Sequence, residues 1–266
     1  MKRLEFIIPT LVAILLFTLS VAFQGTKAGV AIGTSFLVFV IILAITTCFF
    51  AFRIIKVYGR IVGNAVIYLV LAIFSFSAIY PYQFFLILSG VETGFTIVLW
   101  EHLIFYIGMV LFFTAVNKIN KHDSNPIKKG ILSQKDKINI GIFVMIFFFL
   151  VILVIPLSPY SSSLAGTFID TSQMLHIIAF VLAFFVAREV NKMKSSVGKT
   201  LSSSVGSLFL AILFLGLIHF WETLIGNLKV FTVSEDIITT TIYLLFSVAM
   251  ASFIFAFRKI YKAVPL

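Results

Sequence analysis

The feature that most constrains this chain is a series of eight apolar runs, each close to the length of a helix that crosses a lipid bilayer. About 20 residues at a rise of ~1.5 Å per residue span the ~30 Å hydrocarbon core. The runs cover residues 7–23, 30–52, 61–88, 93–116, 138–157, 171–187, 203–226 and 235–257. None shows the alternation expected of a barrel strand. The pattern predicts an all-α fold, a polytopic integral membrane helix bundle of eight transmembrane helices.

The composition agrees with a membrane protein and excludes several classes of function. Hydrophobic residues make up 61% of the chain and charged residues 11%, whereas soluble domains carry about 25% charged residues. The lipid bilayer is the expected partner, and a membrane protein partner is left open. The longest connection, 118–137, is too short and too basic for a soluble catalytic domain. We expect one membrane domain, 1–266, with no nucleic-acid and no nucleotide partner.

Lysine and arginine residues predict the orientation. Of these 20 residues, 18 fall on the side that holds both termini, and only Lys27 and Lys229 fall on the other side. Under the positive-inside rule both termini are cytoplasmic, in a multi-pass protein of the cell membrane. The net charge of +10 is therefore a topology signal. In the alternative, the first run is a secretory signal cleaved near Ala22, which leaves seven spans.

The basic cytoplasmic loop 118–137 separates two candidate repeats, 1–117 and 138–266. Residues 49–53 (FFAFR) resemble residues 184–188 (FFVAR), at the ends of the second and sixth runs. A duplicated four-helix unit would give two parallel repeats related by an axis along the membrane normal. The alternative is coincidence, because apolar helices that end in basic residues look alike.

Ionisable residues inside the apolar runs are the best clue to function. His102, His176 and His219 lie on three different runs at comparable depth, in the half of the membrane expected to face outside. Glu101 and Glu222 lie beside two of them. A charged side chain at the centre of a spanning helix costs about 2.5–3.5 kcal/mol on insertion scales, so such residues usually face the bundle interior.

Helical spacing favours an inward direction for two of the histidines. His219 and Glu222 are three residues apart and therefore share a face. His176 shares its face with Ala179 and Ala183, and small residues of this kind allow two helices to pack closely. We therefore expect both histidines to face a neighbouring helix.

Further polar residues complete the candidate set. Glu101 lies midway between Gly94 and Gly108, again a close-packing stripe, and His102 shares its face with Val98 and Tyr106. Tyr243 lies on a polar face of the last run. The candidate metal ligands are His102, His176 and His219, and the candidate ligand-binding or proton-carrying residues are Glu101, Glu222 and Tyr243.

Three functions remain open for this set. The first is a sensor or transporter that handles a small ligand, a metal ion or a proton through a His/Glu pocket, and it favours a non-enzymatic protein. The second is a bound Zn, Cu or haem, with hydrolysis of a lipid-like substrate as one use. The third is a structural or accessory subunit. Eight spans with a histidine–carboxylate cluster resemble, in outline only, membrane-embedded zinc hydrolases and copper-resistance membrane proteins, whose signature sequences are not present here.

Overall fold

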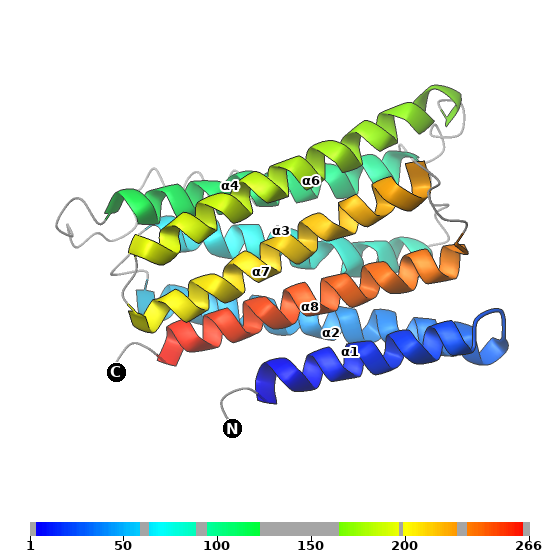
Figure 1. Ribbon diagram of the computed structural model, residues 1–266, viewed down its shortest axis with the longest axis horizontal. Coiled ribbons are helices and arrows are strands. Elements are labelled where there is room, and N and C mark those ends of the chain that lie inside the picture. Colours follow the sequence, from blue (N-terminus) through cyan, green and yellow to red (C-terminus); the bar gives the residue numbers. More distant parts are fainter. Residues whose placement is uncertain are drawn as a thin grey trace. The chain divides into compact units, whose positions relative to one another are not determined.

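The computed structural model describes residues 4–58, 64–88, 95–122, 165–196, 199–227 and 233–262 (Figure 1). These residues are helical apart from short turns, and none of them forms a strand. Six of the helices are long and apolar enough to cross a membrane. The prediction of an all-helical fold is thereby confirmed over these residues, and the six apolar helices agree with a multi-pass membrane protein.

The helices follow the predicted runs in order. They are α1 (Leu4–Ala22), α2 (Lys27–Tyr58), α3 (Asn64–Leu88), α4 (Phe95–His122), α6 (Ala165–Ser196), α7 (Lys199–Glu222) with the π-helical turn η2 (Thr223–Asn227), and α8 (Glu235–Lys262). The first run corresponds to α1, whose apolar part, Phe6–Ala22, is shorter than the other six spans. The fifth run, 138–157, lies outside the described residues. The count of eight spans therefore stays a prediction.

Several helices extend beyond their apolar runs into basic sequence. The run that ends at residue 187 belongs to α6, which continues to Ser196, and the run that ends at 257 belongs to α8, which continues to Lys262. Lysine and arginine are good helix formers, and cations near a helix C-terminus interact favourably with its dipole. The apolar run thus marks the part of a helix in the hydrocarbon core, and the helix itself is longer.

The chain divides into two compact units. Unit 1 comprises Met1–Ile54 and His176–Leu266, and unit 2 comprises Ile55–Leu175. The two boundaries fall inside α2 and inside α6, each of which is one continuous helix. The predicted repeats, 1–117 and 138–266, concern internal similarity, which this division does not test, and they stay a prediction.

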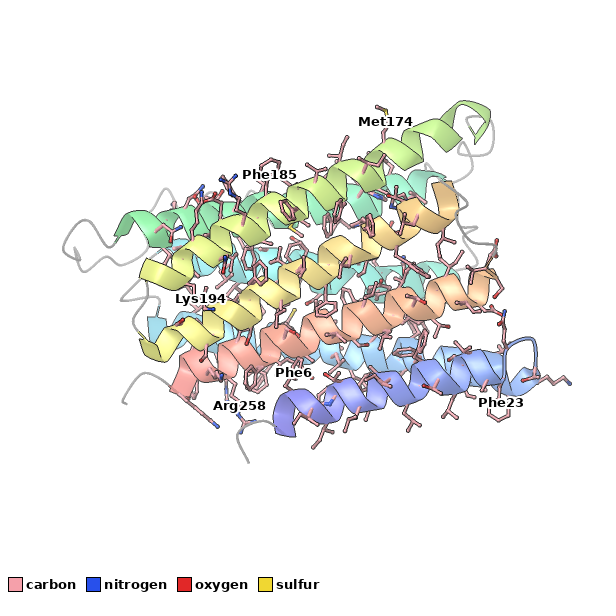
Figure 2. All side chains as sticks on the ribbon, viewed as in Figure 1. Phe6, Phe23, Met174, Phe185, Lys194 and Arg258 are labelled. Atoms are coloured by element: carbon pink, nitrogen blue, oxygen red, sulfur yellow. The ribbon has the colours of Figure 1, made fainter. Side chains whose placement is uncertain are left out.

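Aromatic side chains from neighbouring helices pack on α8 in unit 1. Phe6 of α1 lies 6.0 Å from Phe255 between ring centroids (Figure 2). Phe36 of α2 is fully buried and meets the edge of Tyr243 at 5.7 Å. Buried aromatic rings contribute large apolar areas to a core of this kind.

Large apolar side chains also cover outer surfaces, as a bilayer requires. Met174 and Phe185 of α6, both labelled in Figure 2, are 66% and 53% exposed. An apolar surface of this extent is unusual on a soluble protein, and it is the expected surface of a helix in lipid. This exposed stripe of α6 is the opposite face to the one that carries Ala179 and Ala183, which are buried.

Close packing of α3 against α4 organises unit 2. A Cβ atom on Gly108 would lie 2.5 Å from Cε1 of Phe76, so the ring occupies the space that a side chain would need. Phe76 also packs on Phe105, with ring centroids 5.8 Å apart. The predicted close-packing role of Gly108 is therefore confirmed, and Gly94 lies outside the described residues.

Candidate metal centre

Helices α6 and α7 approach closely in unit 1 because small residues meet between them. A Cβ atom on Gly216 would lie only 2.8 Å from Cβ of Ala183. One turn away, the rings of Phe180 and Phe220 pack with centroids 5.0 Å apart. The small-residue face that the sequence predicts on α6 is thus the face that meets α7.

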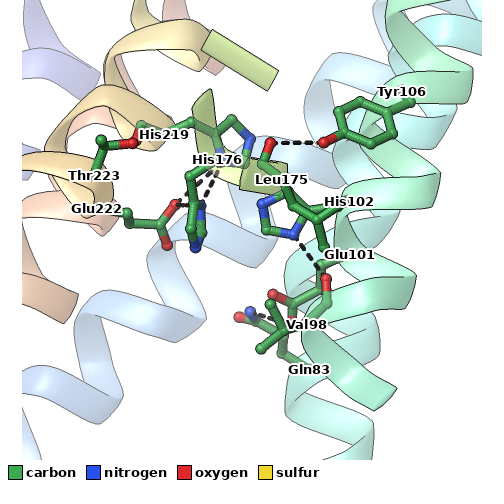
Figure 3. Close-up of polar contacts among 10 residues, drawn as sticks. All are labelled: Gln83, Val98, Glu101, His102, Tyr106, Leu175, His176, His219, Glu222 and Thr223. Carbon is green, nitrogen blue, oxygen red and sulfur yellow. Dashed lines mark hydrogen bonds and ion pairs between the residues drawn. The ribbon is translucent and has the colours of Figure 1, made fainter. Parts of the chain in front are cut away.

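This approach brings three polar side chains together within the candidate spans Met174–Lys194 and Ser202–Ile225 (Figure 3). Nδ1 of His176 lies 3.0 Å from Oε2 of Glu222, and Nδ1 of His219 lies 3.2 Å from the same oxygen. The two Nδ1 atoms are 3.3 Å apart. We call these three side chains the HHE triangle. Their exposed side-chain fractions are small, 13% for His176, 11% for His219 and 25% for Glu222.

The Glu222 carboxylate of the HHE triangle lies against two imidazole rings. Its Oε2 atom is buried and has no hydrogen bond of ordinary geometry, although both imidazoles lie within ion-pair distance. The two imidazoles are within hydrogen-bond distance of each other, so one Nδ1 can donate while the other accepts. When neither Nδ1 carries a proton, these three neighbouring atoms can each donate an electron pair.

A local change of helix type follows directly after the triangle. Glu222 is the last α-helical residue of α7, and the π-helical turn Thr223–Asn227 begins at the next residue. The Thr223 hydroxyl donates to the carbonyl of His219 at 2.8 Å. Single π turns inside helices occur often at functional sites. Sequence reasoning missed this turn, for which Gly226 is the only nearby signal.

His102 has a different environment, in unit 2. It is 2% exposed, and its Nδ1 lies 2.7 Å from the carbonyl oxygen of Val98. Because a carbonyl only accepts, this contact requires a proton on Nδ1 and leaves the lone pair on Nε2. The ring also meets Tyr106 edge-on at 6.1 Å (Figure 3). Both neighbours are those expected from helical spacing.

The remaining predicted residues have other neighbours. Glu101 accepts a hydrogen bond of 2.6 Å from Nε2 of Gln83, a residue of α3 that the sequence did not single out. Tyr243 packs on Phe36, as described above. Roles for Glu101 and Tyr243 in binding a ligand or a proton stay predictions.

No protein-family model, no curated protein and no solved structure matches this chain. Its class therefore rests on its own structure. Over the described residues the chain is all-helical, with six helices able to cross a membrane and with a histidine cluster in which His176 of α6 meets His219 of α7.

Proposed function

We propose that this chain is an integral membrane protein that binds a divalent transition-metal ion at His176, His219 and Glu222, and that it handles the ion as a transporter or sensor. The observation that carries the proposal is the convergence of two imidazole nitrogens and one carboxylate oxygen, with mutual distances of 3.0, 3.2 and 3.3 Å. Imidazole and carboxylate together suit Zn, Cu, Ni and Co.

The size of the triangle fits such an ion. Zinc binds histidine nitrogen and carboxylate oxygen at about 2.0–2.2 Å, so adjacent ligand atoms are roughly 3.3–3.5 Å apart at a tetrahedral centre and about 3.0 Å apart at an octahedral one. The observed distances of 3.0 to 3.3 Å span these two cases. An ion above the triangle could bond all three atoms with little movement of the side chains.

Charge also favours a bound cation. An ionised carboxylate inside a membrane span is expensive unless it is paired. The partners of Glu222 in the structure are the two imidazoles, which are neutral when they bind a metal through Nδ1. A divalent ion would supply the compensating charge that neutral imidazoles cannot.

A single ion suits this geometry better than haem. Two imidazoles on opposite sides of a haem iron place their nitrogens roughly 4 Å apart, twice a metal–nitrogen bond, with the porphyrin between them. The two Nδ1 atoms here are only 3.3 Å apart, and Glu222 lies beside both. This separation supports adjacent ligands of one ion.

Additional ligands remain part of the proposal. The sequence also predicts His102 as a ligand. A metal-binding imidazole usually donates its other ring N–H to a carbonyl or carboxylate, and His102 does so with Val98. Its membership of the ligand set stays a prediction, and the assay below tests it directly.

An enzymatic use of the same ligands is the second candidate. Two histidines and one glutamate form the ligand set of several catalytic zinc sites, in which water occupies the fourth position. The composition of the HHE triangle is the specific observation that favours it. Metal-dependent hydrolysis of an ester lipid by the purified protein would support this candidate over transport or sensing.

The test is metal binding by the full chain, purified and reconstituted in lipid nanodiscs. After removal of metal with a chelator, we expect Zn²⁺ or Co²⁺ to bind with about one ion per chain and with micromolar or tighter affinity. His176→Ala and His219→Ala should each weaken binding by at least about 100-fold, because a lost ligand cannot be replaced inside the membrane.

Glu189→Gln provides the matched control. Glu189 is a carboxylate of the same helix α6, and it pairs with Lys192 at 2.6 Å rather than with a histidine. We expect this variant to bind metal as the unchanged protein does. A reconstituted protein that binds neither ion, or that binds it equally well without both histidines, would show that the HHE triangle only joins α6 to α7 through polar contacts.

A further inference from the structure

One hydrogen bond next to the HHE triangle comes from a different helix. The hydroxyl of Tyr106, on α4, donates to the backbone carbonyl of Leu175 at 2.6 Å (Figure 3). Leu175 immediately precedes His176 in α6. We infer that Tyr106 is a positioning residue for His176, through which α4 tunes the metal site. This inference rests on the proposed function.

The bond is of a kind that does not arise from helix formation alone. The carbonyl of a residue inside an α-helix already accepts the N–H group four residues later, and Tyr106 uses the second lone pair of the same oxygen. The distance of 2.6 Å is at the short end of the range for O–H···O hydrogen bonds. Tyr106 lies in the candidate span Val98–Asn120, where little water competes for either partner.

Because the bond is made to the residue before His176, it can affect where the His176 side chain lies. A side-chain tip lies roughly 6 Å from a helix axis, so a rotation of about 10° moves it by about 1 Å. The donor atoms of the HHE triangle are already within 3.0 to 3.3 Å of one another. A displacement of ~1 Å would take one of them out of bonding range of an ion that the other two hold.

The connection also crosses the boundary between the two units through the chain itself. Leu175 is the last residue of unit 2, and His176 is the first residue of the second segment of unit 1. Both belong to α6, which is unbroken from Ala165 to Ser196. A change at the Leu175 carbonyl would therefore reach His176 through the next peptide unit of the same helix. Tyr106 would thereby tune the affinity for metal.

The test is Tyr106→Phe, which removes the hydroxyl and keeps the ring. The probe is Co²⁺ bound to the reconstituted full chain, because its visible ligand-field bands report the geometry of the ligands. We expect the variant to bind about one Co²⁺ per chain with about 10-fold weaker affinity, the lower end of the range for lost outer-shell partners. We also expect the ligand-field bands to shift.

Tyr68→Phe is the matched control, since Tyr68 is another tyrosine of unit 2. Its ring holds Nζ of Lys118 at 4.4 Å, an interaction that does not require the hydroxyl. This variant should match the unchanged protein in affinity and in spectrum. A Tyr106→Phe protein with unchanged bands and affinity, even if less heat-stable, would overturn the inference and leave the metal site intact. Absence of Co²⁺ binding in the unchanged protein would instead overturn the proposed function.

Discussion

The histidines of the two units differ in what their Nδ1 atoms face. In unit 1, Nδ1 of His176 and of His219 face each other and one carboxylate oxygen. In unit 2, Nδ1 of His102 is bonded to the backbone of its own helix. Three histidines of similar expected depth thus have two kinds of environment. The imidazoles of His176 and His219 lie beside a carboxylate, and the backbone contact of His102 fixes which of its ring nitrogens carries the proton.

The carboxylates of the two units show the same contrast. Glu222 lies between two bases that can bind a proton or a metal ion, whereas Glu101 accepts a hydrogen bond from the neutral amide of Gln83. A carboxylate among imidazoles can share a cation with them because both kinds of side chain are metal ligands, whereas an amide N–H group is not a metal ligand. We therefore expect the two glutamates to differ strongly in their effect on metal binding.

The largest expected difference is between Glu222→Gln and Glu101→Gln. The first change removes the negative charge and one ligand of the HHE triangle, so we expect at least about 100-fold weaker binding of Zn²⁺ by isothermal titration. The second change should alter the affinity by less than about 3-fold. Equal losses in the two variants would show that the contrast between the units does not extend to metal binding.

His102→Ala tests whether the sequence-based ligand set is correct. If His102 contributes its Nε2 to the ion, we expect about 10-fold weaker Zn²⁺ binding with the same stoichiometry, because the HHE triangle still supplies three ligands. The measurement is the same titration. An unchanged affinity would remove His102 from the ligand set and confine the site to unit 1.

Gly216→Ala tests the close approach that assembles the HHE triangle. The added Cβ would lie 2.8 Å from that of Ala183, so α6 and α7 must separate or shift. We expect about 5- to 10-fold weaker metal binding and a lower melting temperature, since overpacking typically costs about 1–3 kcal/mol.

Gly206→Ala is the control for this change in the same helix. Apart from its own turn of helix, no described residue comes within 4 Å of a Cβ placed at Gly206, and alanine has the higher helix propensity. This variant should bind metal normally and be at least as stable as the unchanged protein. If the two alanine variants behave alike, the close contact of Gly216 with Ala183 does not control metal binding or stability.

Thr223→Val should have the smallest effect. It keeps the shape of the side chain but removes the hydroxyl that donates to the carbonyl of His219. We expect a loss of Zn²⁺ affinity of about 2- to 3-fold, because net contributions of single hydrogen bonds are near 1 kcal/mol and only part of this one reaches the imidazole. A loss as large as that for Gly216→Ala would show that the Thr223 hydrogen bond matters as much to metal binding as the packing of α6 on α7.

Those parts of the fold that depend on local sequence were predictable. Apolar length identified the spanning helices, and a three-residue spacing placed His219 and Glu222 on one face, as the structure shows. The partner of each face was not predictable. The small residues of α6 indicate close packing, but nothing in their spacing identifies Gly216 as the residue that they meet.

Contacts to the backbone were harder still to predict. Helical spacing placed Tyr106 beside His102, but the Tyr106 hydroxyl bonds to the backbone carbonyl of Leu175. Because every residue has a backbone carbonyl, the sequence does not indicate which one accepts the bond. The partner of Glu101 was missed for a similar reason. Gln83 is an ordinary polar residue near the end of its helix, and its link to Glu101 depends on how α3 and α4 pair.

The π turn after Glu222 holds one more residue than ordinary winding would need. A π turn accommodates about one residue more than an α turn, and each residue of an α-helix turns the chain by about 100°. Deleting a single residue from Thr223–Asn227 would let ordinary winding resume with little change in the direction in which the chain leaves α7. Glu222, on the N-terminal side of the turn, would keep its place. This helix end can therefore lose one residue without moving the carboxylate that faces His176 and His219.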